Sequence, residues 1–312
     1  MARYVVYRLL QTIPVLFGVS VVVFLLVRLI PGNPAIAILG SRATPELVAR
    51  VKDELGLDLP LWQQYLNWLG NVMRLQFGIS FFYQSDVAPI TFGRLPITLA
   101  LLIYSTLMAL FISVPLATIA ALRRGGFVDQ AIRLLFTATL GIPSFWLAII
   151  LALVLGVQLK LFPIAGPGNG GLDTVWHLTL PALTIALSIS PILARSLRSS
   201  LIEVLGSDPI TTGRAAGLRR PTLLWSYTLR NSLLPLITVL ALNLGWMIGG
   251  TVIVEQVFGL PGLGSLLLTS ISSRDYAIIQ FVTLVFAVLV ILVNLVADLS
   301  YAFLDPRVSL RR

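Results

Sequence analysis

The sequence predicts an all-α protein that crosses a membrane six times and has a small external helical cap between the first two spans. Of its 312 residues, 57% are hydrophobic and 11% are charged, and the mean hydropathy is +0.94. These values lie far from those of soluble domains. The apolar residues also gather in runs of about 20, the length that a helix needs to cross a bilayer.

Six such runs are expected to form one transmembrane domain over residues 1–312, and they cover residues 9–30, 97–122, 131–159, 178–197, 233–254 and 278–303. Two arginines precede the first run, as in a signal peptide. That run is longer than the apolar region of a typical signal peptide and has no clear small-residue cleavage site. We therefore expect it to be an uncleaved anchor.

The basic residues predict the orientation of these spans. Lysine and arginine are enriched in cytoplasmic loops, and one side of the membrane receives Arg3, Arg8, Arg123, Arg124, Arg133, the arginines between positions 195 and 230, Arg307, Arg311 and Arg312. Both termini are therefore expected in the cytoplasm. The net charge of +9 is distributed by loop and forms no nucleic-acid motif, so we expect no nucleic-acid partner.

Residues 31–96, between the first two spans, are expected to form the external cap. Residues 44–69 have the apolar spacing of helices, and Gly56 and Pro60 divide them into two short ones. Six aromatic residues of this segment either contact a substrate or partner or form a belt at the membrane interface: Trp62, Trp68, Phe77, Phe81, Phe82 and Tyr83.

The basic loop at residues 198–232 is the candidate contact with a soluble partner. Asp208 is expected to cap a helix that has Pro209 at its first position, and Gly217 follows the end of this helix. Residues 210–216 therefore predict a helix of about two turns. A short capped helix on the cytoplasmic face suggests a docking element.

Catalytic chemistry has little support in the sequence. Cysteine is absent and His177 is the only histidine, so a thiol nucleophile and a multi-histidine metal site are both excluded. A position at the membrane interface explains His177 better than Ser-His-Asp catalysis does. The chain lacks the phosphate-binding motif G-x-x-x-x-G-K-[ST]. We expect no cofactor on this chain. If the protein transports a solute, the energy for transport must come from an ion gradient or from another subunit.

Short motifs occur in order along the chain, among them Arg28-Leu29-Ile30-Pro31-Gly32-Asn33-Pro34, Leu55-Gly56-Leu57-Asp58, Leu229-Arg230-Asn231 and Leu304-Asp305-Pro306-Arg307. The ordered set resembles the dipeptide/oligopeptide/nickel permease family of ATP-binding-cassette (ABC) importers, and its opening resembles the first permease of the usual unlike pair. The basic loop resembles the so-called EAA loop of such permeases. It lacks the triplet that gives the loop its name, and Thr211-Thr212-Gly213 stands in that place.

The resemblance implies a type I importer permease fold in a bacterial inner membrane. It also implies four kinds of neighbour: a second permease, two cytoplasmic ATPases that bind ATP and Mg, an external substrate-binding protein and the lipid bilayer. The permease itself would not be an enzyme. Its loop would transmit ATPase closure, with Asp208, Gly213, Arg214, Gly217, Arg219 and Arg220 as candidate coupling residues. The arginines could equally serve only to hold the loop in the cytoplasm.

A substrate pathway should be lined by residues that lipid does not favour. The third and fifth spans offer Ser144, Phe145, Trp146, Asn243, Trp246, Gly249, Gly250, Thr251 and Glu255. Asn243 can hydrogen-bond a substrate amide. Helix packing explains the glycines as well as close approach of a substrate does.

Di- and oligopeptides are the most common substrates of the family that the chain resembles, and nickel chelates, glutathione and other small solutes are alternatives. A gradient-driven transporter is the alternative from a different class. It predicts ionisable groups near mid-membrane and internal repeats, whereas the charges here cluster at the ends of spans and no repeat is evident.

Cysteine labelling tests the orientation, because the cysteine-free sequence gives a clean background. Cysteines at Ser207 and Ser309 should react with a membrane-impermeant maleimide only from the cytoplasmic side, and a cysteine at Asn169 only from outside. The opposite labelling pattern would overturn the orientation.

Overall fold

The computed structural model describes residues 2–29, 44–54 and 58–304, and most of this part of the chain is helical. The start of the expected cap, residues 31–43, and the C-terminal Arg307, Arg311 and Arg312 lie outside the described residues. The chain groups into two compact units. Unit 1 contains residues 98–260 and the last part of the chain from residue 292, and unit 2 contains residues 2–97 and 261–291.

Unit 2 contains the two short helices expected in the cap. α3 (Pro45–Glu54) follows Thr44, whose hydroxyl accepts a hydrogen bond from the N–H of Leu47 at 3.3 Å, and α4 (Leu61–Met73) follows Pro60. A capping threonine favours a helix start, and so does a proline at the first helical position, which Pro45 occupies in α3. The other elements of unit 2 are α1 (Ala2–Leu29), the antiparallel strands β1 (Ile79–Ser80) and β2 (Ser85–Asp86), the start of α5 (Val87–Leu122), α12 (Leu263–Ser273) and the first part of α13 (Tyr276–Leu304).

Asp275 joins the β1–β2 hairpin to α13. The residue is 2% exposed, and its carboxylate accepts the Ser80 hydroxyl at 2.5 Å and the Phe82 N–H at 3.3 Å. It also accepts the N–H of Ile278, in the first turn of α13, at 3.4 Å. One buried carboxylate therefore caps a helix and fixes a turn that is 195 residues away in sequence.

Packing accounts for several of the cap aromatics. Phe77 stacks on Phe281 with ring centroids 3.8 Å apart, and Trp68 packs against Phe24 of α1 with centroids 5.9 Å apart. Trp62 and Phe82 are the most exposed of the six, at 61% and 58%. These two, together with Phe81 at 36%, are the exposed cap aromatics and can face a partner or the membrane interface.

Unit 1 is built around α8 (Gly171–Leu205), whose most apolar stretch is largely buried. It packs against α6 (Phe127–Leu140), α7 (Ser144–Leu151) and α11 (Arg230–Val257). Small residues of α8 such as Ala182 and Ala186 are fully buried and let neighbouring backbones approach closely. The hydroxyls of Tyr104 on α5 and Thr179 on α8 lie 3.2 Å apart.

The six expected spans are only partly recovered. In the described part of the chain, four helices are long and apolar enough to cross a membrane, and the number is five if α6 and the helix of α7 and η2 (Ala152–Gln158) form one broken span. Within α1, the apolar stretch Leu10–Leu25 is shorter. The expected third span at residues 131–159 is not one continuous helix, because α6 and the helix of α7 and η2 meet at an angle of 107°. Gly141 and Pro143 lie at this break, and proline cannot continue the hydrogen-bonding of a helix.

A buried ion pair ties α6 to α8. Asp129, in the first turn of α6, is fully buried. Its carboxylate accepts the Nε–H of Arg198 at 2.7 Å and the Nη2–H of Arg198 at 2.6 Å. The N–H of Gly125 donates a third hydrogen bond at 2.9 Å. Bidentate pairs of this kind are among the stronger polar contacts in proteins.

Asp129→Ala should lower the free energy of unfolding by about 3 kcal/mol, because it leaves the guanidinium of Arg198 without its buried carboxylate. The double variant Asp129→Leu/Arg198→Met removes both charges and should lie closer to the wild-type protein. Thermal melting of the three proteins in detergent makes the comparison. A wild-type melting temperature for Asp129→Ala would show that the pair contributes nothing to stability.

Candidate functional site

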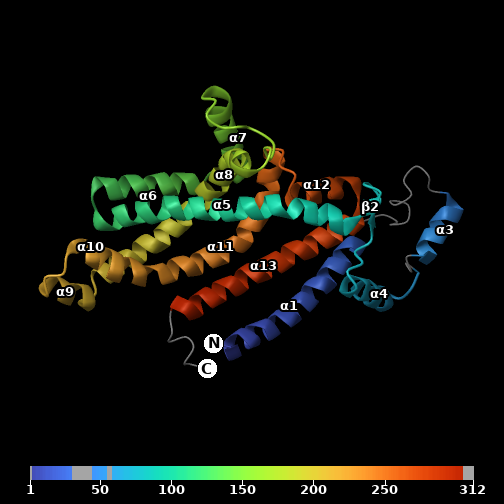
Figure 1. Cartoon of the computed structure of the whole chain (residues 1–312), viewed down its shortest axis with the longest axis horizontal. Coiled ribbons are helices and arrows are strands. Elements are labelled where there is room, and N and C mark those ends of the chain that lie inside the picture. Colours follow the sequence, from blue (N-terminus) through green and yellow to red (C-terminus); the bar gives the residue numbers. More distant parts are fainter. Residues whose placement is uncertain (1, 30–43, 55–57, 305–312) are drawn as a thin grey trace. The chain divides into compact units, whose positions relative to one another are not determined.

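A short helix of unit 1 connects α8 to α11. α9 (Asp208–Ala215) follows the turn at Gly206 and leads through α10 (Arg220–Thr222) and the π-helical η3 (Leu223–Leu229) into α11. Figure 1 shows α9 and α10 at the end of unit 1 opposite α7. Because α8 and α11 pack along each other, both sides of α9 are attached to the most closely packed helices of the unit.

Gly217 follows the end of α9, as predicted. Its φ of +78° is a left-handed conformation that glycine adopts at no steric cost. The N–H of Gly217 donates to the carbonyl of Arg214, and the N–H of Leu218 donates to the carbonyl of Gly213, both at 3.0 Å. These two bonds form the Schellman motif that closes a helix C-terminus. The end of α9 is therefore fixed in direction.

Gly213 lets α9 pack closely against η3. The residue is buried, and a β-carbon at this position would lie 2.8 Å from Cδ2 of Leu223 and 3.3 Å from Cδ1 of Leu218. The structure therefore gives Gly213, one of the candidate coupling residues, a packing role inside the chain.

The start of α9 differs from the prediction by one residue. Asp208 is the first residue of the helix, and Ser207 occupies the cap position. The carbonyl of Ser207 accepts the N–H of Ile210 and of Thr211, each at 3.2 Å. Serine and aspartate are equally favoured as caps, so composition did not distinguish them. In the first turn, the Asp208 carboxylate still interacts favourably with the helix dipole.

The predicted coupling arginines Arg214, Arg219 and Arg220 are all exposed. Within the described part of the chain, no carboxylate forms an ion pair with them. On η3, Trp225 is 66% exposed and Tyr227 is 45% exposed. We did not single out these two aromatics from the sequence, although large aromatics in a basic loop are a usable signal. Exposed arginine and aromatic side chains are typical of protein contact surfaces.

Part of α11 presents an exposed row of residues at helical spacing: Leu242, Trp246, Gly249 and Ile253. Trp246 is 84% exposed. A β-carbon on Gly249 or Gly250 would meet no atom within 4 Å. Packing inside the described chain therefore does not explain these glycines, and the space beside them is open to a neighbour.

Other candidate pathway residues on α11 make contacts within the chain. Glu255 is fully buried and accepts the hydroxyl of Thr98 at 2.7 Å. Thr251 is also fully buried, and its hydroxyl donates to the carbonyl of Ile248 at 2.8 Å. The amide of half-buried Asn243 donates to the carbonyl of Val239 at 2.7 Å. In this structure, Thr251 and Glu255 are not exposed to an open pathway.

The candidates from the third span lie at the start of α7. Ser144 is its first residue and is half-buried, while Phe145 and Trp146 are 49% and 47% exposed. Because α7 packs against α11, the structure brings the two candidate segments together within unit 1.

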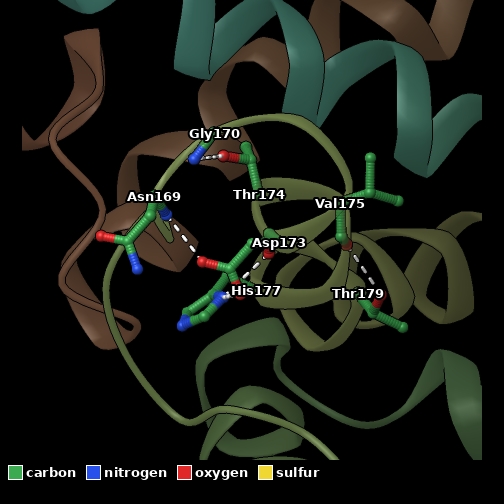
Figure 2. Close-up of polar contacts among 7 residues, drawn as sticks. All are labelled: Asn169, Gly170, Asp173, Thr174, Val175, His177 and Thr179. Carbon is green, nitrogen blue, oxygen red and sulfur yellow. Dashed lines mark hydrogen bonds and ion pairs between the residues drawn. The ribbon is translucent and has the colours of Figure 1, made fainter.

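Figure 2 shows the start of α8, where the single histidine of the sequence lies. Asp173 accepts the N–H of Asn169 at 2.7 Å, and Thr174 accepts the N–H of Gly170 at 3.2 Å. Nδ1 of His177 lies 2.9 Å from the carbonyl oxygen of Asp173 and 3.3 Å from its Oδ1. These contacts fasten the loop before α8 to its first turns. The described residues include no group of three or more His, Cys, Asp or Glu that could hold a metal ion.

Comparison with known families decides what kind of membrane protein carries these features. Residues 113–310 match the family described as "Binding-protein-dependent transport system inner membrane component", and residues 1–102 match the model of its N-terminal region. The chain belongs to this family. It is an ABC importer permease subunit, as its sequence motifs predicted. The boundary between the two family models lies close to residue 98, where unit 1 begins.

Relatives match along almost the entire permease. The oligopeptide transport system permease protein AppB of Bacillus subtilis (strain 168) is 38% identical, over 99% of this chain and 100% of the relative. The probable peptide ABC transporter permease protein y4tP of Sinorhizobium fredii is 36% identical, over 99% of both chains. The glutathione transport system permease protein GsiC of Escherichia coli (strain K12) is also 36% identical, over 99% of both chains.

Solved structures confirm the fold class of the permease. A chain from an inward-facing structure of the MetNI methionine ABC transporter superposes with a TM-score of 0.58 at 16% identity, over 69% of this chain and 96% of that one. A chain from an amino acid ABC transporter gives a TM-score of 0.51 at 14% identity, over 68% of this chain and 92% of that one. At this level of identity the likeness concerns the fold alone, which is that of type I importer permeases.

Gly249→Trp tests whether the exposed glycine of α11 faces the second permease or the pathway, or faces lipid. A β-carbon at this position meets nothing within 4 Å inside the chain, so we expect the variant to fold and insert like the wild-type permease. If Gly249 faces the second permease or the pathway, overpacking there should reduce transport by about tenfold or more. Gly70→Trp in α4, where a β-carbon is equally unobstructed, is the matched control. Wild-type transport by well-expressed Gly249→Trp would place this residue against lipid.

Proposed function

We propose that this permease imports di- and oligopeptides across the bacterial cytoplasmic membrane, with both termini in the cytoplasm. Two of the relatives that match it end to end are named as oligopeptide and peptide permeases. Glutathione, the substrate in the name of a third relative, is itself a small peptide and is the nearest alternative cargo. The orientation is supported by the arginines that gather on one side of the spans.

The partners in this proposal are a second, unlike permease, two cassette ATPases and an external substrate-binding protein. The family description itself names binding-protein-dependent transport. The chain contains no G-x-x-x-x-G-K-[ST] motif, so ATP and Mg would bind to the ATPase chains. The exposed arginines and aromatics of α9, α10 and η3 would form the docking surface for one ATPase.

The observation that carries the coupling proposal is the fixed attachment of α9. Its C-terminal turn is closed by the Gly217 motif, and its buried Gly213 packs on Leu223 of η3. η3 continues without a break into α11, which carries the exposed row from Leu242 to Ile253. A displacement of α9 by an ATPase would therefore be passed to α11 through packed helices. Interfaces of this kind shift as units because cores are close-packed.

Gly217→Val should uncouple ATP hydrolysis from uptake. Valine strongly disfavours a φ of +78°, so the turn after α9 would change direction. The complex, co-expressed with its partners and reconstituted in liposomes, should lose ATP-driven peptide uptake by about tenfold or more. Arg219→Ala removes only an exposed contact and should change uptake much less.

The outcome that contradicts the proposal is wild-type uptake by a well-expressed Gly217→Val complex. The same liposomes test the energy source, since uptake by the lone chain driven by an ion gradient would indicate a secondary transporter. The rate of peptide uptake, compared with the rate of glutathione uptake in the same assay, decides between the two proposed substrates.

A further inference from the structure

Unit 1 contains a cavity of about 620 Å³ between the end of α5, most of α6 and the second half of α8. Its lining includes Arg124, Arg133, Arg195 and Arg198, with Asp129 as a single carboxylate. The coupling route through α9 and the exposed row on α11 do not use this cavity.

The cavity has more positive charge than the chain neutralises. Arg198 is paired with Asp129 at 2.6 Å. Arg124, Arg133 and Arg195 are exposed, and no carboxylate within the described ranges forms an ion pair with any of the three. Several guanidinium groups around one space repel each other, and a bound anion would offset this repulsion.

The walls of the cavity are held in place. The Asp129 carboxylate binds Arg198 of α8 and the N–H of Gly125 in the turn before α6 at the same time. The helices that carry Arg133 and Arg195 are therefore fixed relative to each other. Guanidinium groups present a planar fork of donors that matches the oxygens of a phosphate group.

Apart from Thr137 and Ser199, the remaining lining is apolar and includes Ala117, Phe136 and Pro191. Pro191 precedes Arg198 by seven residues on α8, which places it about 10 Å farther along the helix axis. At the start of α6, two residues before Asp129, the apolar side chain of Phe127 is 85% exposed and can be covered by lipid. The cavity is therefore charged at the interface and apolar toward the bilayer interior, which matches a phospholipid better than a soluble anion.

We propose that this cavity binds the phosphate headgroup of an anionic glycerophospholipid, with Arg133 and Arg195 as its main contacts and the apolar end against the start of an acyl chain. In the proposed orientation the arginine end faces the inner leaflet, where basic pockets between transmembrane helices bind anionic headgroups. The bound lipid would bridge α6 and α8 beside the Asp129–Arg198 pair. The site is separate from the ATPase docking surface on α9.

Native mass spectrometry of the assembled, delipidated complex tests this site. Phosphatidylglycerol is the probe, and phosphatidylcholine and inorganic phosphate are run in parallel. The wild-type complex should retain phosphatidylglycerol and neither of the others. Arg133→Gln/Arg195→Gln should weaken this binding by about thirtyfold, which corresponds to about 1 kcal/mol for each arginine. Arg123→Gln changes an arginine next to Arg124 that does not line the cavity, and this control should bind like the wild-type complex.

Equal binding by the double variant and the wild-type complex would overturn the proposal, as would equal loss in Arg123→Gln. Displacement of the lipid by inorganic phosphate would identify a soluble-anion site instead. Release of the ATPase subunits from the double variant with lipid binding unchanged would assign these arginines to a protein contact. If the double variant does not assemble, the melting temperature of the wild-type complex is the test. Phosphatidylglycerol should raise this melting temperature and phosphatidylcholine should not. An equal response to both lipids would contradict the proposed site.

Discussion

Inside a bilayer every backbone N–H and C=O must form a hydrogen bond within the protein. This constraint limits the places where the permease can have non-helical backbone. In unit 1 the long helices satisfy it internally, and irregular backbone is confined to a few places. One is the break between α6 and α7 at Gly141 and Pro143. Another is the stretch from Gly206 to Arg219, which contains α9. The first lies beside the candidate pathway, and the second forms the candidate docking surface. The proposed docking segment thus lies where the long helices stop, whereas the exposed row of α11 lies within a continuous helix.

The Asp129–Arg198 pair and the closed end of α9 both hold neighbouring helices in a fixed arrangement. A subunit that transmits force needs helices that move together, and each of these features removes a local degree of freedom. The ion pair fixes α6 to α8, while the Gly217 turn and the contact of Gly213 with Leu223 fix α9 to η3. The exposed row on α11 then lies at the other end of a continuous helical path.

Much of this arrangement could be predicted from the sequence, because the relevant signals are local. The apolar spacing of residues 44–69, divided at Pro60, predicted two short cap helices, and Gly217 predicted the end of a helix. Features that depend on tertiary contacts were not predicted. Burial of Glu255 against Thr98 joins residues 157 positions apart, and no periodicity reveals such a pairing. The bend before α7 was also not predicted. Its glycine and proline were visible in the sequence, but the apolar run was counted as one span by its length alone.

The central claim is that α9 docks on a cassette ATPase, and site-specific cross-linking tests it most directly. A cysteine at Thr212, an exposed position on α9, would be the only thiol of the permease because the natural sequence has none. In the assembled complex it should cross-link to the ATPase through a short bifunctional reagent, with a yield that changes when ATP is bound, and a cysteine at Asn169 should give no such product. Efficient cross-linking of the ATPase from Arg123→Cys, with none from Thr212→Cys, would contradict the claim.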